Sequence, residues 1–280
     1  TNRSGRVSAE TLKDFISNRM LLDGDITAAN VSYETSSVEE YLDNLTSVYD
    51  KRYVEKVTIS SFGAVNGADN TAAIQAAVNS VQGTGRRLIF DVSGTITTPI
   101  AVADSIWIDS ENFYDEFGTN GIKYSINLPS TNNFAFYCTQ PNMSLNISNI
   151  WFHSLVGFAV SCTAKVSSFN RLRLTGSKGI KLDNTYICYV DDLECYCTDR
   201  GLEIVGDCSP TIRGGNYGAG NATYGAIYIS THAGKTSISG SYLESQANPT
   251  VVANGCLDSA IFIYDYYDEN ATTGCIKVID

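Results

Sequence analysis

A repeat of about 22 residues constrains the fold of this chain more than any other feature. Five short strands of alternating apolar residues begin at spacings of 24, 22, 22 and 25 residues. Their first residues are Phe134, Phe158, Ile180, Leu202 and Ile227. A second pattern, apolar-x-x-apolar-x-apolar, recurs out of phase with the first at spacings of 22, 21, 22 and 26 residues. Its members are Ile147/Ile150/Phe152, Phe169/Leu172/Leu174, Val190/Leu193/Cys195, Ile212/Gly215/Tyr217 and Ile238/Ser241/Leu243.

Both ladders predict the same architecture. Strands that return with this period, without intervening helices, are typical of a parallel β-helix, in which each turn stacks on the one before it. Connections between parallel strands of one sheet are almost always right-handed. The sequence therefore predicts a mainly β protein in which residues 86–280 form a right-handed, single-stranded parallel β-helix.

Residues 1–56 differ from the remainder because they hold most of the helical patterns. Ser36 followed by Glu39 makes a capping box, and the helix that follows has apolar residues at heptad spacing from Val38 to Tyr49. Two heptads are too short for a stable isolated helix, so this stripe needs a partner. Two interpretations stay open: a seam between copies of the chain, or an amphipathic helix packed within its own domain.

Residues 57–85 predict a strand, an Asn-Gly turn and a helix that begins at Asp69 or Asn70. The apolar stripe of this helix consists of Ile74, Ala77, Val78 and Val81. A short helix that is polar on its other face suits the cap at the open end of a solenoid.

The segment from Ile59 to Val81 resembles the start of the pectate-lyase-like right-handed β-helices of bacteriophage tailspikes. Those β-helices commonly begin with a strand that ends in Phe-Gly-Ala, then a turn, then Thr-Ala-Ala-Ile-Gln-Ala-Ala. This chain has both parts, at residues 62–64 and 71–77. It departs from the pattern at the turn, where a longer acidic stretch is usual and only Asp69 remains. The resemblance covers roughly residues 26–255.

The resemblance implies a homotrimer on a phage tail that binds, and often cleaves, a bacterial capsule or lipopolysaccharide O-antigen. It implies that residues 1–56 are a short α/β attachment and neck region that joins other tail or baseplate proteins. Residues 57–85 then supply the first strand and the capping helix. Such a protein is made in the cytoplasm of the bacterial host and acts outside the cell in the virion tail. Tailspikes usually carry a further C-terminal module, and none is evident here, so we expect either a fragment or a short spike.

Composition argues against several other functions. The formal net charge is −11, from 30 acidic and 19 basic residues, which disfavours sequence-independent binding to nucleic acid or to an anionic membrane. The apolar runs are far too short to be inserted in a membrane. None of the eight cysteines lies in a Cys-x-x-Cys pair and only two histidines exist, so we expect neither a metal site nor a cofactor. Several cysteines fall at inward positions, which favours free core thiols over an extracellular disulfide framework.

The register of the second ladder predicts a strip of polar and aromatic side chains on the outer surface. Outward positions of successive turns stack at about 4.8 Å. Aromatic faces pack on sugar rings, while amides, arginines and carboxylates hydrogen-bond to hydroxyls or, for arginine, bind an acidic sugar. The residues that we expect to bind substrate are Trp151, Arg171, Arg173, Asn216, Tyr242 and Glu244. Trp151 and Tyr242 have an alternative role as contacts within a trimer.

Asp191, Asp192 and Glu194 form the densest carboxylate group in the repeats and are the candidate catalytic residues. Inverting glycosidases need two carboxyl groups about 6.5–9.5 Å apart. Residues i and i+2 on one strand face are separated by about 6.5–7 Å. Asp192 and Glu194 therefore suit inversion if the bend before Leu193 leaves both on one face. The alternative is a solvated acidic edge, balanced by arginines of neighbouring turns.

Three classes of function stay open: a polysaccharide depolymerase, a non-catalytic receptor-binding spike, and a structural tail fibre or shaft. An endoglycosidase is favoured over a lyase because no Ca²⁺-binding loop of defined spacing supports calcium-dependent elimination. Together with the resemblance to tailspikes, which implies the phage role and the bacterial polysaccharide, this ranking leads us to expect a tailspike that binds and depolymerises that polysaccharide during host adsorption.

Overall fold

A computed structural model describes residues 32–33, 36–37, 56–110, 125–128, 134–219, 221, 223–230, 234–244, 248–256, 260–268 and 276–279. The chain divides into two compact units, Thr1–Glu55 and Lys56–Asp280. In the first unit, strands β1 (Ser32–Tyr33) and β2 (Ser36–Ser37) pair antiparallel. The apolar stripe from Val38 to Tyr49 lies outside the described residues, so both interpretations of it stay predictions.

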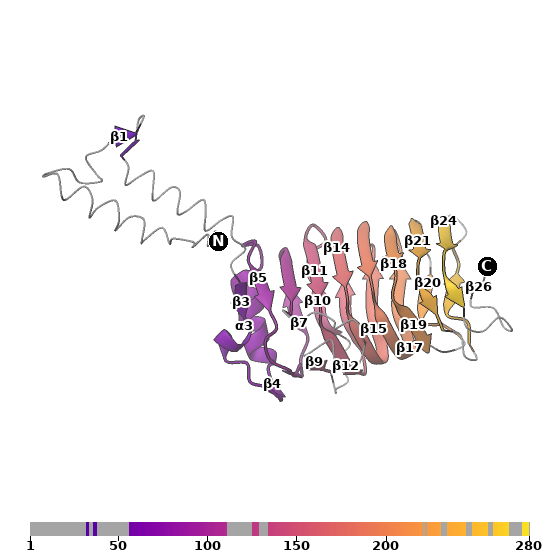
Figure 1. Ribbon diagram of the computed structural model, residues 1–280, viewed down its shortest axis with the longest axis horizontal. Coiled ribbons are helices and arrows are strands. Elements are labelled where there is room, and N and C mark those ends of the chain that lie inside the picture. The colour runs from indigo at the N-terminus through magenta and orange to yellow at the C-terminus, as the bar shows by residue number, and fades with distance from the viewer. Residues whose placement is uncertain are drawn as a thin grey trace, which may run out of the picture. The chain divides into compact units, whose positions relative to one another are not determined.

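The described residues of the second unit form a parallel β-solenoid, whose turns follow one another from β3 to β26 (Figure 1). Nine turns each contribute one strand to a parallel sheet that we call the first sheet. In spatial order its strands are β3 (Lys56–Thr58), β5 (Arg87–Ile89), β8 (Ile106–Asp109), β11 (Ser144–Ser148), β14 (Val166–Asn170), β16 (Ile187–Asp191), β18 (Pro210–Arg213), β21 (Lys235–Ser239) and β24 (Ala260–Tyr264).

The remaining strands join in two arms that share the long strands β15 (Arg173–Asp183) and β17 (Glu194–Val205). One arm, called the second sheet, adds β4 (Ala68–Asp69), β6 (Gly94–Thr95), β9 (Ser125–Asn127), β12 (Trp151–Leu155), β19 (Asn216–Ala219), β22 (Tyr242–Leu243) and β25 (Tyr267–Asp268). The other arm, called the third sheet, adds β7 (Ile100–Val102), β10 (Phe134–Cys138), β13 (Phe158–Cys162), β20 (Ile227–Ser230), β23 (Val251–Asn254) and β26 (Ile276–Ile279).

The predicted parallel β-helix is confirmed, and the ladders correspond to inward rows of these sheets. In the first sheet, Ile147 pairs with Phe169, Phe169 with Val190, and Val190 with Ile212. One ladder needs a correction in the third sheet, because Ile180 pairs with Val160 and not with Phe158. A shift of two residues keeps a side chain on the same face of a strand, so alternation alone could not detect it. The hand of the coil stays a prediction.

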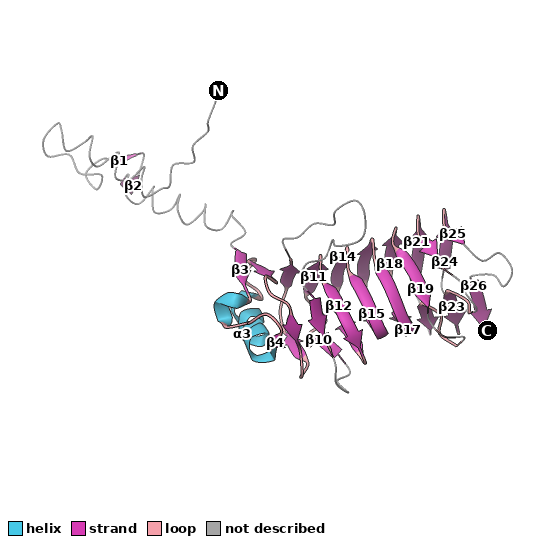
Figure 2. Ribbon diagram, turned by 60° about the horizontal axis from the view of Figure 1, so that its bottom comes forward, coloured by secondary structure: helices cyan, strands magenta, loops and turns pink. Residues whose placement is uncertain are grey.

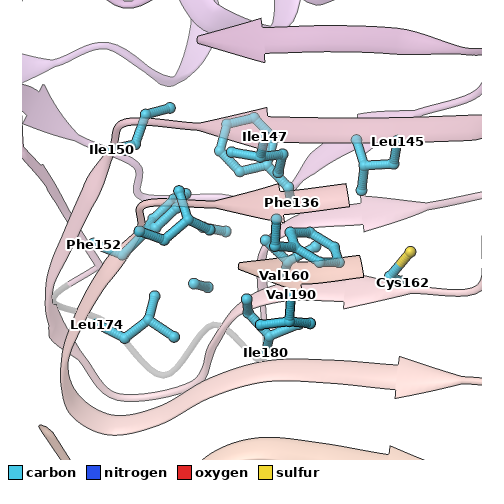
Figure 3. Close-up of a cluster of buried hydrophobic side chains, with 14 of the residues drawn as sticks. Phe136, Leu145, Ile147, Ile150, Phe152, Val160, Cys162, Leu174, Ile180 and Val190 are labelled. Atoms are coloured by element: carbon cyan, nitrogen blue, oxygen red, sulfur yellow. The ribbon is translucent and has the colours of Figure 1, made fainter. Parts of the chain in front are cut away.

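Inward side chains from the three sheets fill the interior of the solenoid. Figure 3 shows Phe136, Phe152, Ile147 and Val160 directed towards one another from neighbouring strands. Phe136 makes edge-to-face contacts with Phe90 and Phe152, with ring centroids 6.2 and 6.1 Å apart. This geometry is favourable for aromatic pairs, and it continues one apolar core from turn to turn.

A sharp corner joins the first sheet to the second in successive turns. The corner residue has a left-handed backbone, with φ of 58° at Asn149, 50° at Arg171, 52° at Asp192 and 64° at Gly214. Each corner N–H donates to the next turn, as from Arg171 N to Asp191 O over 2.9 Å and from Asp192 N to Arg213 O over 2.9 Å. The corner therefore separates side chains that are adjacent in sequence and sends them to different faces.

Among the described residues, α3 (Thr71–Val81) is the α-helix, and it lies at one end of the solenoid (Figure 2). A 3₁₀ turn, η3 (Ser60–Phe62), precedes it. The buried residues of α3 are the predicted ones: Ile74, Ala77, Val78 and Val81. Gln75 exchanges hydrogen bonds of 2.8 and 3.0 Å with the backbone of Ala101 in β7. The helix thus covers the core at the first turn of the solenoid.

No helix among the described residues is long and apolar enough to span a bilayer.

Candidate functional site

The structure brings five of the predicted site residues into one row on the outer face of the second sheet. Strand pairing joins Trp151 to Arg173, Arg173 to Glu194, Glu194 to Asn216 and Asn216 to Tyr242. We call this row the second-sheet strip. With about 4.8 Å per turn, its four steps span about 19 Å. A glycan lying parallel to the solenoid axis would contact several of these side chains at once.

Contacts within the strip hold its side chains in place. The Arg173 guanidinium lies 4.9 Å from the centroid of the Trp151 ring, and its Nε lies 3.5 Å from Glu194 Oε2. Trp151 Nε1 donates a 3.1 Å hydrogen bond to Thr175 Oγ1. His153 stands edge-on to Trp151 at 4.9 Å and is 2.9 Å from Asn127 Oδ1. Trp151, Arg173 and Glu194 are therefore pre-ordered, which lowers the entropic cost of binding a ligand.

A second row lies beside the strip, two residues further along each strand. Thr175 pairs with Tyr196, and Tyr196 pairs with Gly218. A Cβ built on Gly218 would lie 2.9 Å from Glu244 Oε2 and 3.3 Å from the Tyr196 ring, so Glu244 extends over Gly218 towards Tyr196. The predicted binding residue Glu244 thus lies next to the strip.

Tyr196 is a site residue that the sequence analysis missed. Its hydroxyl accepts a 2.9 Å hydrogen bond from Asn216 Nδ2, and its side chain is exposed. Partial desolvation of the phenol raises the pKa of Tyr196 above its usual value, and the negative charges of Glu194 and Glu244 raise it further. The residue stays a neutral hydrogen-bonding phenol at physiological pH. Its position two residues after Glu194 on an alternating strand was the signal that would have identified it.

At the other end of the strip, Tyr242 extends the aromatic surface. Its ring stacks on Tyr267 of β25, with centroids 5.0 Å apart and planes 21° apart. Tyr267 is 61% exposed. The strip therefore has aromatic rings at both ends, Trp151 and the Tyr242–Tyr267 pair, with charged and amide groups between them.

The three candidate carboxylates lie in three different places. Asp191 ends β16 in the first sheet, Asp192 is the corner residue, and Glu194 begins β17 in the second sheet. The i, i+2 spacing of one strand face therefore does not apply to Asp192 and Glu194, because the left-handed corner separates them. Asp192 lies over the next turn, since a Cβ on Gly214 would be 2.3 Å from its Oδ1.

Two of the three carboxylates have arginine partners in neighbouring turns. Arg213 binds Asp191 in a bidentate fashion, over 2.7 Å from Nε to Oδ1 and 2.9 Å from Nη2 to Oδ2. Glu194 has Arg173 at 3.5 Å. This is the arrangement of the predicted acidic edge balanced by arginines, and it leaves Asp192 as the carboxylate at the boundary between the two faces.

Arg171 does not belong to the strip. It is a corner residue, and it lines a depression on the outer face of the first sheet. Within the described part of the chain, no three His, Cys, Asp or Glu side chains are grouped so that they could hold a metal ion.

No protein-family model, curated protein or solved structure matches this chain. The fold is typical of proteins that bind or depolymerise polysaccharides. A fold alone does not determine function, so a particular function has to be inferred from the residues exposed on its faces.

Proposed function

We propose that this chain is a tailspike that binds a bacterial capsular or O-antigen polysaccharide along the second-sheet strip and depolymerises it during host adsorption. The observation that carries the proposal is the in-register row of Trp151, Arg173, Glu194, Asn216 and Tyr242. A polysaccharide is itself a repeating chain, and a row with a fixed step offers equivalent contacts to successive sugar units. Aromatic, cationic, amide and carboxylate groups are the ones that recognise sugar rings and hydroxyls.

The proposed reaction is hydrolysis by an endoglycosidase, with Glu194 and Asp192 sharing the acid and base roles. Glu194 stands at the middle of the strip, so a glycan on the strip passes over its carboxylate. Asp192 is the corner residue two positions before the start of β17, and its side chain lies by Gly214 of the next turn, so the proposed pair acts across the corner. In an inverting reaction one carboxyl protonates the glycosidic oxygen, and the other takes a proton from the attacking water. Asp191, the third candidate carboxylate, is paired with Arg213 and takes no part in the proposed reaction.

The proposal also assigns a place and partners to the chain. We propose a homotrimer in the virion tail, made in the host cytoplasm, in which residues 1–56 join other tail or baseplate proteins. The resemblance of residues 59–81 to the start of tailspike β-helices supports this assignment.

The test is incubation of the protein with polysaccharide from a susceptible host. New reducing ends indicate hydrolysis, and ultraviolet absorbance from an unsaturated uronate indicates elimination instead. Glu194→Gln and Asp192→Asn are expected to abolish cleavage while binding and melting temperature stay unchanged. The matched control is Asp207→Asn, an exposed carboxylate on a turn away from the strip, which is expected to cleave normally. Full activity in both site variants overturns the assignment of the residues.

A non-catalytic receptor-binding or structural shaft protein is the second candidate. The ion pairs of Arg213 with Asp191 and of Arg173 with Glu194 favour it, because carboxylates that brace neighbouring turns need no chemical role. Binding of host polysaccharide without any product identifies the receptor-binding protein. Neither binding nor product identifies the shaft.

A further inference from the structure

Two of the buried cysteines lie opposite each other on neighbouring turns of the third sheet. Tyr137 of β10 pairs with Ser161 of β13, and the next residues along these strands are Cys138 and Cys162. Both side chains belong to the buried core, and their Sγ atoms are 4.0 Å apart. We call these two residues the thiol pair. Among the cysteines that the structure describes, no other two occupy opposed positions on paired strands.

The backbone of the thiol pair has the spacing that a disulfide requires. Bridged cysteines have Cα atoms about 4.4–6.8 Å apart and sulfur atoms about 2.05 Å apart. Opposed residues of neighbouring strands are about 4.8 Å apart, so the Cα atoms already satisfy the first condition. The two sulfur atoms, at 4.0 Å, have to approach by about 2 Å. Rotation about the side-chain bonds can supply a movement of this size without a change in strand register.

A hydrogen bond already joins the two sulfur atoms, with Cys138 Sγ as the donor and Cys162 Sγ as the acceptor. This hydrogen bond lowers the pKa of Cys162 below its usual value, and hydrogen bonding from the Ala164 backbone lowers it as well, although burial acts in the opposite direction. At Cys188, by contrast, desolvation raises the pKa well above its usual value. A thiolate therefore forms more readily in the thiol pair than at Cys188, and the thiolate is the reactive form of cysteine.

A small oxidant can reach the thiol pair from the side of Cys138. This residue is 8% exposed, whereas Cys162 and Cys188 are 0% exposed. Cys138 ends β10, and the residues that follow it, 139–142, are exposed. Hydrogen peroxide is little larger than water, so it needs a smaller opening than an alkylating thiol reagent does. Cys138 is therefore the sulfur of the pair that meets an oxidant first.

We propose that Cys138 and Cys162 form an oxidation site, at which hydrogen peroxide closes a disulfide between two successive turns of the solenoid. The closed bond restricts the unfolded chain between residues 138 and 162, and it thereby stabilises the folded solenoid. Cysteines of this kind stay reduced in a cytoplasm and become oxidised outside the cell. The inference goes beyond the proposed function, because neither sulfur lies on the second-sheet strip.

The reaction transfers two electrons from the sulfur atoms to the peroxide. The thiol pair releases one proton to water, and its other proton moves along the hydrogen bond to Cys162, which leaves Cys138 as the thiolate. Cys138 Sγ attacks a peroxide oxygen, so that an S–O bond forms, the O–O bond breaks and the leaving hydroxide takes up the released proton. Cys162 Sγ then attacks the sulfenic acid of Cys138, so that the S–S bond forms and the S–O bond breaks, and its proton converts the second hydroxide to water. Two thiols and one hydrogen peroxide thus give one disulfide and two waters.

Peptide mapping of the natural chain tests the site without any variant. The reduced, folded protein is freed of reductant and treated with a small molar excess of hydrogen peroxide, and the remaining thiols are alkylated in denaturant. A protease that cuts after aromatic residues separates the two cysteines, because Phe152 and Phe158 lie between them. Mass spectrometry should find one cross-linked product, which joins Cys138 to Cys162 and has lost two hydrogen atoms. We expect this link to form about tenfold faster, or more, than the Cys188 thiol is lost.

Three results of this mapping overturn the proposal. The first is a disulfide between any other two cysteines in place of the expected one. The second is oxidation of Cys138 to a sulfinic acid without a disulfide. The third is a link between Cys138 and Cys162 that forms only after unfolding in denaturant, since such a link does not depend on the folded arrangement.

Variants and thermal melts test the effect of the bond. Cys162→Ser removes one sulfur of the pair, and we expect no cross-link in it. Cys256→Ser is the matched control, because Cys256 is partly buried and follows β23, several turns further along, and it should cross-link like the natural chain. Oxidation is expected to raise the melting temperature of the natural chain by about 5 °C or more, and a dithiol reductant should reverse this rise. An oxidised chain that melts at or below the temperature of the reduced chain overturns the stabilising role.

The outcomes are independent of the proposed function. The reduced and the oxidised chain are both expected to cleave host polysaccharide, because the thiol pair lies in the core. Absence of the disulfide therefore leaves the depolymerase in place, and absence of cleavage leaves the oxidation site in place.

Discussion

Buried sulfur distinguishes this chain at the scale of single residues. Six cysteines are buried and unbridged: Cys138, Cys162, Cys188, Cys195, Cys197 and Cys208. Cys256 is partly buried and also free, while Cys275 lies outside the described residues. The predicted free core thiols are therefore confirmed for the described cysteines. Burial raises the pKa of Cys188 well above its usual value, because an apolar surrounding disfavours the thiolate.

Thiol accessibility follows from this burial. In a Cys275→Ser variant, whose seven remaining cysteines are all described, we expect only Cys256 to react with a thiol reagent under native conditions. The other six should react after unfolding in denaturant, and mass spectrometry of the labelled peptides identifies each site. Native labelling of two or more of the six buried thiols contradicts the predicted packing.

Stability above pH 9 depends in part on Cys208. Burial raises the pKa of this thiol from 9.0 to about 11. Between these values the unfolded chain releases a proton that the folded chain keeps, so the free energy of unfolding falls as the pH rises. A difference of about two pH units corresponds to a loss of about 3 kcal/mol. Urea unfolding from pH 8 to pH 11 should show a steeper decline for the natural chain than for Cys208→Ala. Parallel declines rule out this contribution.

At the scale of elements, the important feature is the bend within β15 and β17, which lets each strand belong to both the second and the third sheet. The sequence shows Gly179 and Gly201 just before strands, and the structure shows why they are needed. A Cβ on Gly179 would lie 2.1 Å from Gly201 O, and a Cβ on Gly201 would lie 1.7 Å from Cys195 Sγ. The bend thus brings Gly179 against the backbone of the next turn and Gly201 against a side chain of its own strand, so only glycine fits at either position. These contacts form only in the folded solenoid, so the local sequence pattern does not show that glycine is required at these two positions.

Substitution at this bend should be severe. Gly201→Ala is expected to lower the free energy of unfolding by about 3 kcal/mol or more, because the new methyl group must displace a packed sulfur. Gly218→Ala is the matched control: its nearest contact is the flexible end of Glu244, which can move, so we expect a loss below about 1 kcal/mol. Chemical denaturation of both variants measures the difference. Similar losses would show that the bend tolerates a side chain.

The difference between local sequence patterns and contacts between turns also explains how far the candidate site could be predicted. The register of the strip followed from alternation and one period, so Trp151, Arg173 and Glu194 were placed together correctly. The left-handed corner at Asp192 was not predicted, because its conformation depends on hydrogen bonds to the next turn.

At the scale of the whole molecule, the solenoid converts a sequence period into a spatial one. Residues some 22 positions apart become neighbours at about 4.8 Å, so one face can repeat a contact along a polymer. We therefore expect affinity for oligosaccharides of the host glycan to rise with length until they span the strip of about 19 Å, and then to level off. Calorimetric titration with oligosaccharides of defined length measures this. Affinity that does not change with length contradicts binding along the row.

Assembly is the remaining prediction at this scale. A trimer lets an apolar stripe such as that from Val38 to Tyr49 be buried three times in one closed, symmetric association. Light scattering of the full chain should give about 91 kDa, three times the mass of 30.3 kDa for one chain. Because residues 1–55 form a compact unit separate from the solenoid, their removal tests which unit holds the copies together. A fall to the mass of one chain places the contact in the first unit. A single-chain mass for the intact protein at micromolar concentration refutes the trimer, and with it the alternative role of Trp151 and Tyr242 as contacts between subunits.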